Sequence, residues 1–270
     1  MYDISHTITD GIERIVYTPH TRRFETPIVM QHGMWHGAWC WQGWQELLAE
    51  WGWQSHAHSL PGHAGSPVQR PIRWCTLGYY LQLLKAEIDR LPQKPVLMGH
   101  SMGGALTQWL LKERDDLPAA VLVAPWLSHS MVGPILQTIP RDAGGFARCT
   151  LHLTTTPLVR NPFRSAQMFI HEGATFSPVE LYEKLGPESL WVLLQYNPLL
   201  WRPAKRLKTP LLWLAGAADT LIPVTAEAKS ARHYGAAYEV VPGAGHNVMM
   251  EKSWRETAVT IHKWVAKRVA

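Results

Sequence analysis

Short apolar segments alternate with longer helical patterns along most of this 270-residue chain, and this rhythm limits the possible folds more than any other feature. Short apolar runs predict buried strands, whereas apolar residues at positions i, i+3, i+4 and i+7 predict amphipathic helices. The predicted strands cover residues 27–31, 54–60, 95–98, 119–124, 210–215 and 238–241. The predicted helices cover residues 40–51, 77–91, 105–114 and 225–234, with a last helix from Glu251. This alternation predicts a doubly wound, mostly parallel α/β sheet with helices on both faces.

The alternation stops between residues 126 and 206. This segment is rich in Pro, Thr and Trp, and it holds only short helical fragments, such as Pro178–Leu185 and Glu188–Gln195. A segment of about 80 residues is too long for a loop inside a compact domain. We therefore predict an α/β core made of residues 1–125 and 207–270, with an inserted, largely helical cap, or lid, made of residues 126–206.

Composition and charge narrow the class of protein further. A hydrophobic fraction of 46% allows a large core, and the excess of five positive charges is scattered along the chain, which argues against a nucleic-acid partner. The three cysteines form no C-x-x-C pair, the first residues do not resemble a signal peptide, and no apolar stretch is long enough to span a membrane. These features predict a soluble, cytoplasmic protein and leave its oligomeric state open.

The strongest chemical signal is the motif Gly99-His-Ser-Met-Gly103, which lies between a predicted strand and a predicted helix. A serine nucleophile on such an elbow needs small neighbours, because the chain turns abruptly there. A glycine-rich turn with an N-capping serine is the simpler alternative. Capping gives no reason for glycine on both sides of the serine and again at Gly104, so the motif predicts that Ser101 is a nucleophile.

A serine hydroxyl needs an adjacent base, and an imidazole base needs an acceptor that holds its tautomer. Among fourteen histidines, His246 stands out because it follows the last predicted strand and precedes the last helix. Asp219 follows the strand 210–215 in the same way, and the position after the strand that ends at Ala124 holds no carboxylate. We predict His246 as the base and Asp219 as its acid, with Glu251 as the alternative acid.

Two backbone N–H groups are expected to form an oxyanion hole. The amide of Met102 directly follows the nucleophile at a helix start, where N–H groups are unpaired. The turn formed by residues 32–37 follows the first buried strand, and we assign the second donor to the amide of Met34 in that turn. Gly33 is expected to leave room there for the substrate.

The chain resembles the α/β-hydrolase fold family over essentially its whole length, with Ser101, Asp219 and His246 in the family's order. The run His32-Gly-Met-Trp-His-Gly-Ala-Trp-Cys-Trp41 is similar to the opening motif of the plant methylesterase and hydroxynitrile lyase branch. This resemblance implies a small-ester hydrolase with those three residues as its triad. Lyases of the branch carry Thr at the position of Gly33 and Lys directly after the catalytic His, where this chain has Asn247, so the lyase reaction is disfavoured.

Aromatic and methionine side chains near the oxyanion turn and the cap predict an apolar pocket, and such a pocket favours a small, uncharged, largely apolar ester. The pocket residues that we expect are Gly33, Trp35, His36, Trp126, Met131 and Met168. We predict hydrolysis through an acyl-enzyme on Ser101. The triad does not define the bond, however, and a lactone, a thioester or a C–C bond next to a ketone are alternative substrates.

Competing classes of protein fit less well. The histidines at 32, 36, 56, 58 and 63 lack the closely spaced further ligand that zinc hydrolases usually show, and the glycines at Gly103 and Gly104 have no lysine of a phosphate-binding loop nearby. We therefore predict neither a metal nor a cofactor. A non-catalytic homologue that binds a small ligand is the remaining alternative, and labelling by a fluorophosphonate that depends on Ser101 would distinguish it from an enzyme.

Overall fold

The computed structural model describes residues 1–269, which form an eight-stranded sheet with helices on both faces. The strands are β1 (Tyr2–Thr9), β2 (Ile12–Pro19), β3 (Ile28–Gln31), β4 (Ser55–Ser59), β5 (Val96–His100), β6 (Ala120–Val123), β7 (Leu211–Gly216) and β8 (Ala237–Val241). The helices are α1 (Gln42–Glu50), α2 (Leu77–Asp89), α3 (Met102–Glu113), α4 (Val132–Thr138), α5 (Ala143–His152), α6 (Pro162–Phe169), α7 (Pro178–Lys184), α8 (Leu190–Gln195), α9 (Val224–Tyr234) and α10 (Trp254–Val269).

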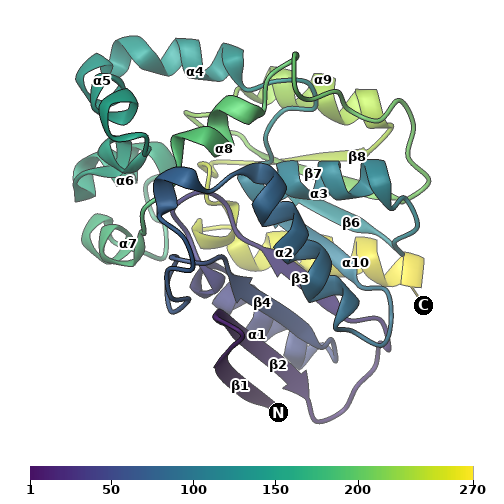
Figure 1. Ribbon diagram of the computed structural model, residues 1–270. Helices are drawn as coiled ribbons and strands as arrows, with labels where there is room; N and C mark the ends of the chain where they lie inside the picture. The colour runs from purple at the N-terminus through teal and green to yellow at the C-terminus, as the bar shows by residue number, and fades with distance from the viewer. Residues whose placement is uncertain (270) are drawn as a thin grey trace.

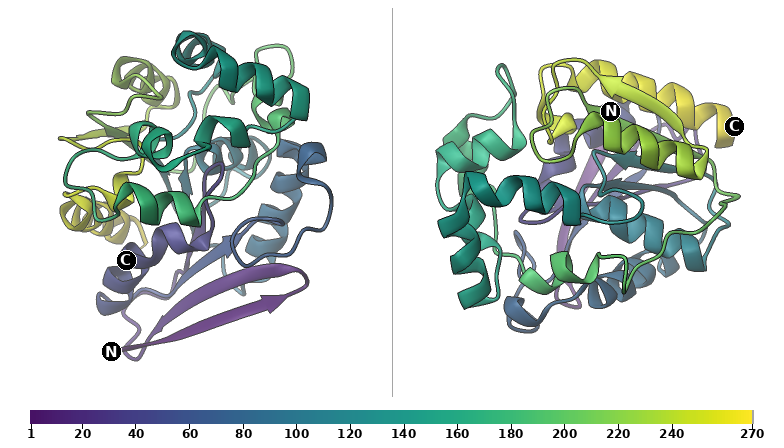
Figure 2. Two further views of the ribbon diagram at one scale, coloured as in Figure 1. Left: turned by 90° about the vertical axis from the view of Figure 1, so that its left-hand side faces the viewer. Right: turned by 90° about the horizontal axis from the view of Figure 1, so that it is seen from above.

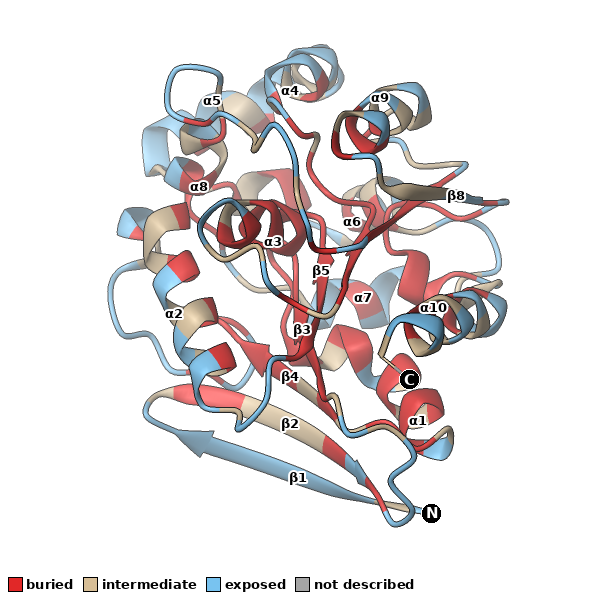
Figure 3. Ribbon diagram, turned by 90° about the vertical axis from the view of Figure 1, so that its right-hand side faces the viewer, coloured by how far each residue is buried: buried red, intermediate tan, exposed pale blue. Residues whose placement is uncertain are grey.

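The strand order is β1-β2-β4-β3-β5-β6-β7-β8, and every pair from β4 to β8 is parallel. The central strands are buried on both faces, as expected for a parallel sheet covered by helices. Figure 3 shows α2 and α3 on one side of these strands and α1 and α10 on the other. The predicted doubly wound, mostly parallel α/β fold is confirmed.

The six predicted strands correspond to β3–β8, but the first two strands were not predicted. They form an antiparallel hairpin that extends the sheet at one edge (Figure 2), and β1 is almost entirely exposed. Asp10 and Gly11 connect them with φ values of 54° and 70°, the positive values that a two-residue type I′ turn requires. The Asp10-Gly11 pair is the feature of the sequence that could have predicted this hairpin.

The segment between β6 and β7 forms five short helices, α4 to α8, together with 3₁₀ turns. Figure 1 shows α4–α7 grouped at one end of the molecule, beyond the sheet. A buried network joins the segment to the core, because Glu188 accepts a hydrogen bond from the Tyr80 hydroxyl (2.9 Å) and lies 3.2 Å from His63 Nε2. The boundaries of the cap at residues 126 and 206 stay a prediction.

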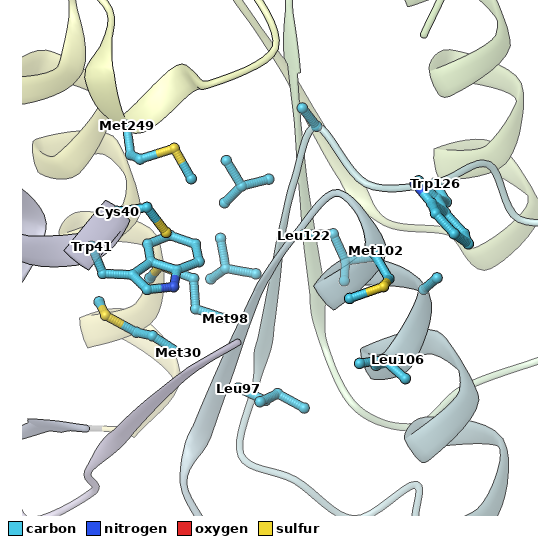
Figure 4. Close-up of a cluster of buried hydrophobic side chains, with 14 of the residues drawn as sticks. Met30, Cys40, Trp41, Leu97, Met98, Met102, Leu106, Leu122, Trp126 and Met249 are labelled. Atoms are coloured by element: carbon cyan, nitrogen blue, oxygen red, sulfur yellow. The ribbon is translucent and has the colours of Figure 1, made fainter. Parts of the chain in front are cut away.

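The main hydrophobic core lies between the sheet and its helices (Figure 4). Met30 and Met98 project from the central strands toward Trp41, whereas Leu122 lies on the side of α3 with Leu106. The three cysteine thiols are buried and unpaired. Among residues 1–269, no helix combines the length and the apolar character needed to cross a membrane.

Candidate active site

Ser101 occupies a sharp elbow between β5 and α3. Its φ of 52° and ψ of −115° lie in a region that residues other than glycine rarely adopt, and the Ser101 N–H donates to the carbonyl of Val123 on β6 (3.0 Å). The helix begins directly at Met102, three residues earlier than predicted. This conformation lifts the serine side chain above the carboxyl end of β5, as expected for a nucleophile elbow.

The glycines around Ser101 are required because a side chain at these positions would not fit. A Cβ atom on Gly99 would come within 3.0 Å of the Gly103 carbonyl oxygen, and one on Gly103 would come equally close to the carbonyl oxygen of Gln31 at the end of β3. A Cβ on Gly104 would meet Pro125, just after β6. The elbow therefore depends on close backbone packing against the two neighbouring strands.

His246 links the serine to a carboxylate. The loop after β8 brings its Nε2 atom to 2.9 Å from the Ser101 hydroxyl, while its Nδ1 atom lies 2.7 Å from Oδ2 of Asp219, which follows β7. The backbone N–H groups of Leu221 and Ile222 donate to the other oxygen, Oδ1 of Asp219, at 2.7 and 3.0 Å. This network assigns a proton to Nδ1 and leaves Nε2 free to accept one from the serine.

Glu251, the alternative acid, lies elsewhere. Its Oε1 atom accepts the backbone N–H groups of Gly245 and His171, each at 2.9 Å, and burial raises the pKa of its carboxyl group. It therefore holds the loop in front of His246 against the segment between β6 and β7. The structure pairs His246 with Asp219 and not with Glu251.

The amides of Met34 and Met102 stay our prediction for the oxyanion hole, and the structure shows both near Ser101. Met102 is the first residue of α3, so its amide has no carbonyl partner inside the helix. Met34 lines the same cavity as Ser101, and residues 1–269 offer its N–H no hydrogen-bonded acceptor. The next residue, Trp35, has a φ of 63°, which marks a tight turn.

His36 and Gly33 were predicted in the pocket, and neither is among the residues that line the cavity over Ser101. His36 is buried behind the oxyanion turn, where its Nδ1–H donates to the Met34 carbonyl (2.7 Å) and its Nε2 accepts from the Asn247 side chain (2.9 Å). Burial lowers the pKa of His36 to about 4, so the ring is neutral. A Cβ on Gly33 would come within 3.0 Å of the His100 and Ser101 side chains, so this glycine makes room for the elbow. That it also leaves room for a substrate stays a prediction.

A cavity of about 500 Å³ opens over Ser101 and His246. The predicted residues Trp35, Trp126, Met131 and Met168 line it. Further lining residues that the sequence did not reveal come mostly from α4–α8 and from the loop after Asp219: Pro134, Ile135, Thr138, Arg141, Asp142, Phe146, Leu158, Arg164, Gln167, Leu193, Thr220, Leu221 and Ile222. The segment 126–206 therefore forms the roof of the cavity.

The remaining histidines near the site have structural partners. His58 Nε2 donates to the Gln31 side chain (2.9 Å), and His100 Nε2 donates to the His246 carbonyl (3.2 Å). Burial lowers the pKa of both rings, so both are neutral at pH 7. In the described part of the chain, no three His, Cys, Asp or Glu side chains converge as metal ligands would.

The comparisons with known proteins agree with this architecture. A model of the "Alpha/beta hydrolase family" matches residues 28–260. The chain is 35% identical over 108 residues to "pFDCC methylesterase MES16" of Arabidopsis thaliana, and 34% identical over 109 residues to "Pheophorbidase" of Raphanus sativus. Each alignment covers 39% of this chain and 40% of the relative, so the matched segment spans two fifths of these curated proteins.

Solved structures resemble the whole fold. A monoglyceride lipase from Saccharomyces cerevisiae superposes with a TM-score of 0.71, at 14% identity, over 99% of this chain and 97% of the lipase. A monoacylglycerol lipase from Paleococcus ferrophilus gives a TM-score of 0.67, at 20% identity, over 95% and 99% of the two chains. At such identities the likeness concerns the fold. From the family match over residues 28–260, we conclude that the chain belongs to the alpha/beta hydrolase family.

Proposed function

We propose that the protein is a serine hydrolase that cleaves a small, largely apolar carboxylic ester through an acyl-enzyme on Ser101. The observation that carries this proposal is the line of hydrogen bonds from Ser101 through His246 to Asp219, at 2.9 and 2.7 Å. Each distance is within the range needed for proton transfer between a nucleophile, its base and the group that orients the base.

In the proposed reaction, His246 takes the proton of the Ser101 hydroxyl while the oxygen attacks the ester carbonyl. The amides of Met34 and Met102 stabilise the negative charge that develops on the carbonyl oxygen. His246 then gives its proton to the leaving alcohol, and the ester C–O bond breaks. A water molecule, activated by His246, attacks the acyl-enzyme and releases the acid, while Asp219 stays ionised throughout.

The wall of the cavity supports an apolar substrate. Met34, Trp35, Trp126 and Met168 surround the region of Ser101 with hydrophobic surface. The names of two relatives, a methylesterase and a pheophorbidase, favour the same class of reaction. Asn247 forms a hydrogen bond with His36 at the position where lyases of this branch carry lysine, which argues for hydrolysis.

A panel of p-nitrophenyl esters of rising chain length, together with a lactone and a peptide amide, tests the proposal. We expect ester hydrolysis and little turnover of the amide. Faster turnover of the lactone would favour the lactonase alternative, and no turnover of any compound by folded protein would favour a small-ligand-binding homologue. The cytoplasmic location remains our proposal, and the three buried, unpaired thiols are compatible with a reducing compartment.

A further inference from the structure

The mouth of the cavity differs in charge from its interior. Near Ser101 the lining is buried and apolar, as at Met34 and Trp126. The lining residues of the exposed class are all polar, namely Arg141, Gln167 and Thr220, and the Arg164 side chain is 31% exposed. Two guanidinium groups therefore lie where the cavity meets solvent.

Both guanidinium groups keep free hydrogen-bond donors. Nη1 of Arg141 donates to the Thr220 carbonyl (3.2 Å), and Nη1 of Arg164 donates to the Arg141 carbonyl (3.3 Å). Within residues 1–269, Arg141 has no carboxylate partner. Because each guanidinium carries five N–H donors, most of them remain available to a ligand.

Among the described residues, Asp142 is the acidic residue that lines the cavity. A third arginine, Arg160, neutralises its carboxylate. Arg160 forms a fork with both of its carboxylate oxygens, with Nη2 3.0 Å from Oδ1, and this hydrogen bonding lowers the pKa of Asp142. Arg164 lies farther from the same carboxylate, at 3.9 Å. With Arg160 paired to Asp142, the positive groups of the cavity lining are the guanidinium groups of Arg141 and Arg164, of which Arg164 makes only the longer contact with Asp142.

We propose that Arg141 and Arg164 bind a carboxylate group on the substrate, at the end remote from the ester that is cleaved. An arginine recognises a carboxylate through two parallel hydrogen bonds, and a positive cleft attracts an anionic ligand. The apolar interior would hold the hydrocarbon body between this carboxylate and Ser101. The proposal rests on the proposed function and changes the predicted substrate from an uncharged ester to a half-ester of a dicarboxylic acid.

Paired substrates test the proposal. Linear p-nitrophenyl esters of increasing length end either in a carboxylate or in a methyl group, and the ratio of kcat/KM within each pair is measured. At the length that spans the cavity, we expect the carboxylate ester to be favoured about tenfold or more. In the double variant Arg141→Gln, Arg164→Gln this ratio should fall to about one, whereas Arg148→Gln, an exposed arginine outside the cavity lining, should preserve it.

A binding measurement decides the proposal independently of turnover. Ser101→Ala protein is titrated calorimetrically with the monomethyl ester of a dicarboxylic acid and with the corresponding dimethyl ester. The monomethyl ester should bind about tenfold more tightly, and the arginine double variant should lose this preference. Equal affinity for the two compounds, or a preference that survives the double variant, would overturn the proposal. Failure of every ester to be hydrolysed would instead refute the proposed function, and the binding result would still stand.

Discussion

At the scale of single residues, the local environment of Ser101 was more predictable than the direction of its neighbours' side chains. The motif at residues 99–103 predicted an elbow because a strand that turns abruptly into a helix at a serine needs small neighbours. The contacts of Gly103 with Gln31 and of Gly104 with Pro125, which also require glycine, are remote in sequence. Gly33 and His36 were assigned to the pocket from proximity in sequence alone. The turn directs the His36 side chain toward the Met34 carbonyl and Asn247, behind the cavity, and no pattern in the sequence reveals which side of a turn faces a ligand.

Asp219 offers a direct test of the proposed triad. Asp219→Asn keeps an acceptor for the Leu221 and Ile222 amides, but the amide group cannot stabilise a positively charged His246. We expect kcat to fall by about 10⁴-fold without loss of the fold. Steady-state kinetics with a p-nitrophenyl ester and circular dichroism give the two readings.

The matched control is Glu251→Gln. Burial raises the pKa of Glu251, and a glutamine can still accept the Gly245 and His171 amides, so this variant should keep activity within a few-fold of the wild type. A small effect in Asp219→Asn combined with a large loss in Glu251→Gln would mean that the acid has been assigned wrongly.

At the scale of helices and strands, the buried parallel strands were predictable because their apolar runs are short and bounded by turns. The hairpin of β1 and β2 was missed because β1 is exposed and carries no apolar run. The cap helices α4–α8 are short, and their packing depends on residues far away in the chain. Glu188, for example, contacts Tyr80 across more than one hundred positions, which no periodicity can reveal.

The packing of α3 against β3 predicts that replacing two different glycines by alanine changes the free energy of unfolding in opposite directions. Gly103→Ala would force a Cβ against the backbone of Gln31, so we expect it to lower the free energy of unfolding by about 3 kcal/mol and to reduce activity. Gly144→Ala in α5 meets no atom within 4 Å and should stabilise the protein by about 0.5–1 kcal/mol. Urea unfolding of both variants measures the contrast, and equal effects would contradict the close approach of α3 and β3.

At the scale of the whole molecule, the cavity unites distant parts of the chain. Core loops supply Ser101 and His246, while α4–α8 supply most of the apolar roof. The arginines of the mouth, Arg141 and Arg164, are 23 positions apart on separate short elements, and nothing in their spacing marks them as a pair. The sequence alone therefore does not predict the positive charge at the cavity mouth.

Buried histidines predict a strong dependence of stability on pH. Burial lowers the pKa of His32, His36, His58 and His100, so these rings are neutral in the folded chain and take up protons on unfolding. A depressed pKa contributes stability above the unfolded value of about 6.5, and this stability is lost as pH falls toward the folded values, which are about 4 for two of these rings.

Two buried carboxyl groups act in the opposite direction, because burial raises the pKa of Glu227 and Glu251. Their stabilising effect is complete below the unfolded value and declines as pH rises. Burial also lowers the pKa of the half-buried His56 to about 4, so five neutral rings oppose two carboxyl groups. The free energy of unfolding should therefore fall as the pH is lowered from 6 to 5. Urea unfolding at several pH values tests this, and a flat profile in that range would contradict the neutral burial of these rings.

The most direct test of the account is the covalent reaction of the folded protein with a fluorophosphonate, read by intact mass and peptide mapping. We predict one adduct, on the Ser101 hydroxyl, with no adduct in Ser101→Ala and much slower labelling in His246→Ala. A folded wild-type protein that stays unlabelled, or a Ser101→Ala variant labelled at the wild-type rate, would show that Ser101 is not the activated nucleophile.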